Sequence, residues 1–486
     1  MHFTSFAYLA FLPLVLLAYR LTPSRKLQNV LLLGASYVFY GWWDYRFCIL
    51  MLVSSLVDYI VGALLHRQES VVRRKWLLAV SIGCNIGLLG IFKYLNFFIE
   101  SFQELGQIFG MNMSGGTLEI ILPVGISFYT FQTMSYTLDI YRRQLKPADS
   151  LIDYLAFVSF FPQLVAGPIE RASHLLPQLQ QRRIVSWEDY ASGVRQILCG
   201  FFKKIVIADS VAVFVSATYV DPAAASGPSL MLATMLFAFQ IYCDFSAYSD
   251  IAIGTARLFG IRLMQNFAYP YFSKSIHEFW QRWHISLSTW FRDYVYIPLG
   301  GNRGSGRLRN RNILLTFIVS GFWHGAAWQF LGWGALHGTA LVAENTTAPS
   351  VQSKGQSSRE RLIPSPSSLA KMLLTFCIVC LGWVLFRAET IGDAMIIWKK
   401  MAFSIVNTAH WHSVWIDYSS HGPLFYTVNM LLAFVLVEWI HRHRSFPLEI
   451  GHWPSPVRWP AYTLVLWLIA EHADKTPQSP FIYFQF

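Results

Sequence analysis

Charged residues are scarce in this chain. Only 13% of its 486 residues are Asp, Glu, Lys or Arg, whereas 54% are hydrophobic and 16% aromatic. Soluble globular domains carry about 25% charged residues, so the composition excludes an ordinary soluble enzyme. Apolar runs recur from end to end and lack the short alternation of membrane β-strands. The sequence therefore predicts an all-α polytopic membrane protein.

Acidic residues are fewer than basic ones, 27 against 38, which gives a formal net charge of +11. A nucleic-acid partner would fit such a balance, but the basic residues lie between apolar runs, where membrane topology alone places them. We therefore expect no nucleic-acid partner. Anionic membrane lipids, or an anionic cytoplasmic substrate, account better for the charge.

Several motifs of metal, hydrolase and nucleotide chemistry are missing. The sequence has no His-Glu-x-x-His, no Gly-x-Ser-x-Gly and no Gly-Lys-Ser/Thr. Of its six cysteines only Cys377 and Cys380 have the spacing of a redox or metal pair, and no second pair accompanies them. We expect packing cysteines, no metal and no bound cofactor. No internal repeat is visible, which disfavours an inverted-repeat transporter.

About eleven membrane crossings are expected, together with re-entrant and interfacial helices. The clearest apolar runs are residues 6–18, 30–43, 49–65, 76–98, 122–140, 193–219, 230–259, 373–386, 425–440 and 462–469. Basic loops at 20–26, 66–75 and 141–146 should face the cytoplasm, so the N-terminus is predicted to be extracytoplasmic. The first run is expected to be a retained helix, because no basic segment precedes it and no small-residue cleavage site follows.

Two other runs are expected not to cross. Residues 154–165 contain Pro162 and are followed by more basic residues, so we predict a re-entrant or interfacial element. Residues 391–403 mix apolar and polar side chains at helical spacing and should lie on the surface. Residues 346–368 form a polar loop rich in Ser and Pro. We expect this loop to lie within one membrane domain over residues 1–486.

His324 stands in a run without charge between Arg311 and Glu344. Burial favours a neutral imidazole, which is the form that a general base needs to take a proton from a hydroxyl. Intramembrane ionisable groups are often functional. A histidine that hydrogen-bonds a neighbouring helix is an equally good interpretation of the residues alone. His337 follows thirteen residues later, about 20 Å along an unbroken helix, and is better interpreted as a packing residue.

His284 lies in a stretch that contains three tryptophans, Trp280, Trp283 and Trp290. If this stretch is one helix, His284 and Ser288 share a face, as do Arg282 and Ser286. Such a mixture suits the wall of a watery pocket. An interfacial helix anchored by its tryptophans explains the same residues and is favoured on composition alone.

Two charged sets lie on either side of these histidines. A glycine-rich loop over residues 300–309 carries Arg303, Arg307 and Arg309, which could bind the phosphates of a nucleotide-bearing donor. A plain cytoplasmic loop is at least as good an interpretation. Asp244 and Asp250 are six residues apart and so lie on different helical faces. We expect them to bind backbone or cationic groups and not to form a paired acid and base.

The segments Trp283–Trp290 and Gly321–Gly325 resemble the membrane-bound O-acyltransferase family, in particular its bacterial members that modify cell-surface polysaccharides. Further stretches that match this family are Gly125–Gln132, Phe161–Gln163, Gly167–Ile169, Gly200–Lys204, Asp244–Asp250, Trp383–Ala388 and Phe481–Phe486. Ala247 stands where the family pattern leads us to expect glycine, a departure that concerns local packing.

The resemblance implies a ring of transmembrane helices around a central tunnel. His324 would be the catalytic histidine, and His284 a second catalytic-site histidine with a positioning or auxiliary role. Residues expected to line the tunnel or bind substrate are Trp283, Ser288, Trp290, Trp323, Gly325, Asp244, Ser246 and Gln132.

The resemblance also implies an activity in the bacterial inner membrane. An acetyl group would pass from cytoplasmic acetyl-CoA, held near Arg303, Arg307 and Arg309, to an extracytoplasmic hydroxyl. The acceptor polysaccharide could be alginate, peptidoglycan or cellulose-like. A periplasmic acetyltransferase or esterase-like partner is expected, because the chain has no large extracytoplasmic domain. The competing interpretations are a transporter or flippase of a polysaccharide export system, and a scaffold of an export complex.

Overall fold

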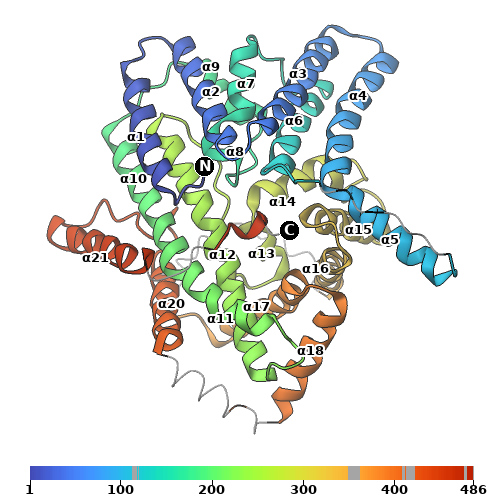
Figure 1. The fold of residues 1–486 in the computed structure, drawn as a ribbon, viewed down its shortest axis with the longest axis vertical. Helices are drawn as coiled ribbons and strands as arrows, with labels where there is room; N and C mark the ends of the chain where they lie inside the picture. The colour runs from blue at the N-terminus through green and yellow to red at the C-terminus, as the bar shows by residue number, and fades with distance from the viewer. Residues whose placement is uncertain are drawn as a thin grey trace. The chain divides into compact units, whose positions relative to one another are not determined.

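The computed structural model describes the chain except for residues 112–115, 117, 119, 348–361, 408–410, 412–421, 475–478 and 485–486. Every regular element in these described parts is helical, which confirms the all-α prediction (Figure 1). The segments Arg46–Arg67, Val71–Ile108, Gly227–Leu258 and Pro366–Arg387 are long and apolar enough to cross a membrane. Phe6–Leu21 and Leu424–Ile440 are shorter apolar helices. The chain is thus a membrane protein in composition, and the count of about eleven crossings stays a prediction.

The chain divides into two compact units, each of which is described by itself. The first unit comprises residues 1–197 and 251–264, and the second comprises residues 198–250 and 265–486. Helices α10 (Trp187–Phe201) and α12 (Gly227–Leu258) run from one unit into the other. Most of the polar loop predicted at 346–368 lies outside the described residues, between α16 (Trp328–Thr347) and α17 (Pro366–Arg387).

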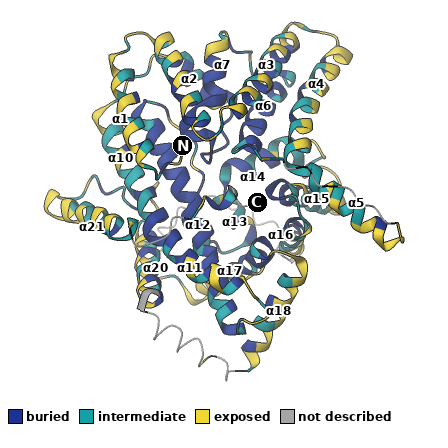
Figure 2. Cartoon of the chain, in the orientation of Figure 1, coloured by how far each residue is buried: buried dark blue, intermediate teal, exposed yellow. Residues whose placement is uncertain are grey.

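The first unit is built around a buried helix. Its elements are α1 (Phe6–Leu21), α2 (Arg25–Gly41), α3 (Arg46–Arg67), α4 (Val71–Leu89), the π-helical turn η1 (Gly90–Tyr94), α5 (Leu95–Ile108), α6 (Ile126–Tyr141), α7 (Leu151–Ser159), α8 (Phe161–Leu164), α9 (Ala172–Gln180), the start of α10 and the end of α12. Helix α6 is buried over almost its whole length and packs on α3 and α4 (Figure 2).

A polar network ties those three helices together. Asp58 on α3 accepts hydrogen bonds from Ser81 (2.5 Å) and Asn85 (2.7 Å) on α4, and Ser81 also bonds Thr137 on α6 (2.9 Å). Because a carboxylate away from water needs such donors, the network explains how an acid can stay in this apolar span.

The run 154–165, predicted to be a re-entrant or interfacial element, is divided between two helices. Helix α7 ends at Ser159, and the four-residue α8 follows after Phe160. The backbone N–H of Phe161 donates to the Ser36 hydroxyl (3.0 Å), so the group left over at the break is satisfied within the protein.

The second unit contains the stretch around both histidines. Its elements after α10 are the π-helical η2 (Phe202–Ala208), α11 (Asp209–Tyr219), α12 up to Asp250, η3 (Pro270–Phe272), α13 (Ile276–Arg282), α14 (Ile285–Phe291), the π-helical η4 (Arg292–Tyr296), α15 (Gly306–His324), α16, α17, α18 (Ile391–Val406), α20 (Gly422–Ile440), α21 (Ser455–Ala473) and η6 (Ile482–Phe484). Residues 391–403, predicted to form a surface helix, lie in α18, many of whose side chains are exposed.

Helices α15 and α16 form a tightly packed hairpin (Figure 1). A Cβ at Gly321 would overlap the carbonyl of Phe330, and a Cβ at Gly334 would overlap the carbonyl of Phe317. Small residues let the two backbones approach this closely, as is usual where membrane helices pack.

Candidate active site

His324 is the last residue of α15. The helix stops there because Gly325 is extended (φ −157°, ψ 148°), and α16 begins only at Trp328. A Cβ at position 325 would overlap the Phe330 ring, so only glycine fits this turn without movement. The imidazole is 4% exposed and lies edge-on to Trp333, with 4.9 Å between the ring centroids. His324 is thus held at a helix end inside an aromatic wall.

His284 lies at a break between two short helices. Its φ of 43° and ψ of 54° are left-handed, a conformation that few non-glycine residues adopt. The conditional expectation of one helix through this stretch is therefore wrong: α13 ends at Arg282 and α14 starts at Ile285. Arg282 and Ser286 consequently do not share a helical face. Packing into the core outweighed the local helical pattern, since His284 is completely buried.

The structure brings the two histidines to one aromatic cluster. Both rings lie beside Trp323, with centroid distances of 4.9 Å for His324 and 6.2 Å for His284. Both also lie beside Tyr483, at 5.7 Å and 6.2 Å. Phe245 packs edge-on against His284 at 4.5 Å. Residues 40 positions apart in the sequence thus contact the same two aromatic rings.

Tyr483 is a candidate site residue that sequence reasoning missed. Its segment was noted only as a matching motif, and no pattern in it pointed toward the histidines. Its hydroxyl is buried and finds no hydrogen-bond partner among the described residues. A hydroxyl that no group of the described chain engages can donate a hydrogen bond to a bound group.

Asp244 holds the segment that carries Tyr483. Its Oδ2 accepts the backbone N–H of Ile482 (2.7 Å), and its Oδ1 pairs with Lys204 (2.8 Å). The same lysine donates to the Ser479 carbonyl (2.8 Å). Asp250 pairs with Lys203 at 2.9 Å. The expectation that these two aspartates bind backbone or cationic groups is confirmed.

Four of the other predicted lining residues belong to the second unit, and Gln132 belongs to the first. Trp283, 1% exposed, packs against Trp383 at 5.0 Å, and Ser288 donates to the Trp283 carbonyl (3.2 Å). Trp290 is buried beside Tyr294 at 5.1 Å. Ser246 is buried on α12, one residue after Phe245, and its hydroxyl has no hydrogen-bond partner in the described chain.

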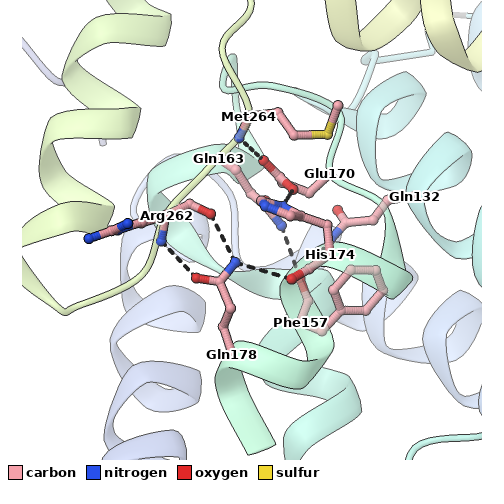
Figure 3. Close-up of polar contacts among 8 residues, drawn as sticks. All are labelled: Gln132, Phe157, Gln163, Glu170, His174, Gln178, Arg262 and Met264. Atoms are coloured by element: carbon pink, nitrogen blue, oxygen red, sulfur yellow. Dashed lines mark hydrogen bonds and ion pairs between the residues drawn. The ribbon is translucent and has the colours of Figure 1, made fainter. Parts of the chain in front are cut away.

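Gln132 belongs to the first unit, whereas the histidines belong to the second. Its side-chain amide donates a hydrogen bond to the Phe157 carbonyl (2.7 Å). The Gln163 side-chain amide donates to the same carbonyl (3.0 Å; Figure 3). Gln132 therefore links α6 to α7 within its own unit.

The arginines predicted in a loop are only partly in one. Arg303 lies in the loop, but α15 already begins at Gly306, so Arg307 and Arg309 lie on its first turns. Ser305 caps this helix by accepting from Leu308, a start that the glycine-rich sequence obscured. Arg303 and Arg307 are exposed. Cationic side chains at the positive end of a helix suit an anionic ligand.

His337 lies nearer to the site than an unbroken helix would allow. Because the chain turns back after His324, the Trp333 ring contacts His324 and His337 alike, both at 4.9 Å. Neither ring nitrogen of His337 has a hydrogen-bond partner among the described residues.

Comparison of the sequence with known proteins identifies a family. Residues 142–381 match the model of the membrane-bound O-acyltransferase family. The chain is 40% identical over 398 residues to the probable alginate O-acetylase AlgI of Azotobacter vinelandii, covering 81% of this chain and 75% of that protein. It is 35% identical over 423 residues to the peptidoglycan O-acetyltransferase of Helicobacter pylori (81% and 78%).

A more distant relative is the teichoic acid D-alanyltransferase of Streptococcus thermophilus, which is 31% identical over 240 residues, 47% of this chain and 58% of that protein. The segment that holds both histidines, residues 284–324, lies inside the span matched by the family model. On these grounds the chain belongs to the membrane-bound O-acyltransferase family and is an acyltransferase.

Proposed function

We propose that the protein transfers an acetyl group from a cytoplasmic thioester, acetyl-CoA, to an extracytoplasmic hydroxyl, and so serves O-acetylation of a cell-surface polysaccharide. Relatives at 35–40% identity are named as acetylating alginate or peptidoglycan. The observation that carries the proposal is the meeting of His324, His284 and Tyr483 at one buried aromatic cluster.

In this mechanism His324 is the general base. Its neutral imidazole takes the proton of the acceptor hydroxyl while that oxygen attacks the thioester carbonyl. The carbon–sulfur bond then breaks, and the thiolate recovers a proton from the imidazolium. The Tyr483 hydroxyl would donate to the developing oxyanion, and His284 would orient the acyl group. Water excluded by the aromatic wall cannot compete as acceptor.

The donor and acceptor arrive from opposite sides of a bacterial inner membrane. Arg303, Arg307 and Arg309 would hold the donor phosphates on the cytoplasmic face. A tunnel through the ring of helices would lead past Trp323 and Gly325. A periplasmic partner would receive the acetyl group or present the polymer.

The test is transfer of label from radiolabelled acetyl-CoA to a hydroxyl acceptor by purified protein in lipid nanodiscs. Loss of the general base in His324→Ala should lower the rate by about 10²–10⁴-fold. His66→Ala, which removes an exposed histidine near the end of α3, is the control and should retain activity. Wild-type protein that transfers no label, or His324→Ala that matches wild type, would indicate transport or scaffolding instead.

A further inference from the structure

The left-handed turn at His284 is not capped by the His284 side chain. This residue is the N-cap of α14, the position whose side chain ordinarily accepts a backbone N–H of the first turn. Its side chain makes no such bond. Ser286, the second residue of α14, is 0% exposed, so its N–H still needs an acceptor within the protein.

Asn266 supplies those acceptors from another segment. Its backbone carbonyl accepts the N–H of Ile285 (2.9 Å), and its Oδ1 accepts the N–H of Ser286 (3.3 Å) and the Ser286 hydroxyl (2.9 Å). Asn266 is itself 0% exposed. A single residue thus takes the place of an N-cap for a helix that starts 19 positions later.

The Asn266 amide is in turn fixed by α12. Its Nδ2 donates to the Ser249 hydroxyl (3.1 Å), which leaves Oδ1 facing Ser286. This orientation is the one that the chemistry requires, because a backbone N–H at Ser286 can only donate. Close by, the N–H of Ala268 donates to the Arg282 carbonyl (3.0 Å), so backbone bonds hold the turn on both sides.

We propose that Asn266 is a positioning residue for acyl transfer: by capping α14 from outside, it holds the left-handed turn and leaves the His284 imidazole directed at the site. This inference rests on the proposed function. If His284 capped its own helix, its ring would point along α14 and away from the Trp323 and Tyr483 rings. Small displacements of a positioning group cost large factors in rate.

The experiment compares two substitutions of similar size at one position. Asn266→Leu removes all three side-chain bonds, whereas Asn266→Asp keeps an acceptor for Ser286 and can accept from Ser249. We expect Asn266→Leu to lower kcat by about 10–100-fold with little change in the KM for acetyl-CoA. Asn266→Asp should be less impaired: the logarithm of its fold-loss in kcat should be at most half that of Asn266→Leu.

Asn29→Leu is the matched control for general loss of stability. Asn29 is likewise 0% exposed and donates to Asp153 (2.7 Å) and the Leu179 carbonyl (2.9 Å), but it belongs to the first unit. Its kcat per folded molecule should stay near wild type even if its melting temperature falls as far as that of Asn266→Leu.

A double substitution separates positioning from mere folding. If Asn266 acts through the imidazole, Asn266→Leu combined with His284→Ala should be no slower than His284→Ala alone. Two results would overturn the inference and leave the proposed function intact. One is a double variant whose fold-loss in kcat is the product of the two single losses. The other is an impaired His284→Ala together with a kcat for Asn266→Leu that equals that of Asn29→Leu. A wild-type rate for His284→Ala would instead remove this histidine from the mechanism, and the inference with it.

Discussion

At the scale of single residues, three side chains from distant parts of the sequence meet at the candidate site. His324 and His284 were recognisable because ionisable groups are rare in apolar sequence. Tyr483 has no such signal, since tyrosine is common in membrane proteins, and only its distances of 5.7 Å and 6.2 Å from the two imidazoles give it a role.

Replacing the Tyr483 hydroxyl tests that role. Tyr483→Phe should slow acetyl transfer by about 10-fold or more, because a donor to the oxyanion is lost. Stability should not fall, since the hydroxyl has no partner in the described part of the chain. Tyr462→Phe removes a hydroxyl in the same state on α21 and is the control. Equal activity of both variants would exclude Tyr483 from the chemistry.

A second residue-scale prediction concerns pH and the pair of Glu170 and His174. Glu170 is fully buried, accepts the N–H of Met264 (2.5 Å) and lies 2.6 Å from His174 Nδ1, as Figure 3 shows. The hydrogen bond to this carboxylate raises the pKa of His174 above its usual 6.5. The imidazolium therefore stabilises the fold below about pH 6.5, and this contribution is lost as the pH rises through the raised pKa.

We expect the melting temperature to fall between about pH 6 and pH 8, and His174→Gln to flatten that dependence. The effect should be on the order of 1 kcal/mol or less, because the His174 side chain is 42% exposed. A steeper fall in the variant than in the wild type would contradict this assignment.

At the scale of elements, the α15–α16 hairpin decides where His324 lies. The sequence between these helices is apolar throughout and would suit one long helix, yet the chain turns at Gly325. The glycines of the hairpin face make the return possible, because the backbones touch at Gly321 and Gly334.

Gly334→Ala should therefore destabilise the protein by about 1–3 kcal/mol, because its Cβ would meet a backbone carbonyl that cannot rotate away. Gly83→Ala on α4 is the control: nothing lies within 4 Å of the new methyl group. It should be neutral or stabilising, as in any helix interior. Thermal denaturation in detergent would measure both, and similar losses would contradict the hairpin argument.

His337 gives a further prediction for this hairpin. Each unsatisfied buried polar atom costs about 1–3 kcal/mol, so His337→Leu should leave stability unchanged or raise it. Acetyl transfer should persist if the ring only packs against Trp280 and Trp333. Lost transfer in a fully stable variant would show instead that this imidazole contacts a substrate.

At the scale of the whole molecule, the charge distribution predicts orientation. Basic loops near 20–26, 66–75 and 141–146 should face the cytoplasm. In a chain whose six free thiols are replaced by alanine, Ser70→Cys should resist a membrane-impermeant maleimide added to intact cells, whereas Met111→Cys should react. Both positions are exposed in the structure. The reverse labelling pattern would show that the topology is inverted and that Arg303, Arg307 and Arg309 lie on the outer side.

The sequence by itself determined the helical class and the membrane setting, marked the interruption of the run around Pro162, and singled out both histidines as candidates. These follow from composition, from local breaker residues and from motifs that are contiguous in the chain. Only the tertiary structure decided that His284 sits in a left-handed turn, that Arg307 and Arg309 are helical, and that Tyr483 and Trp333 lie beside His324. The turn at His284 and the position of Tyr483 depend on contacts between segments tens to hundreds of residues apart, and long-range packing of this kind overrides local propensity without leaving a periodic signal.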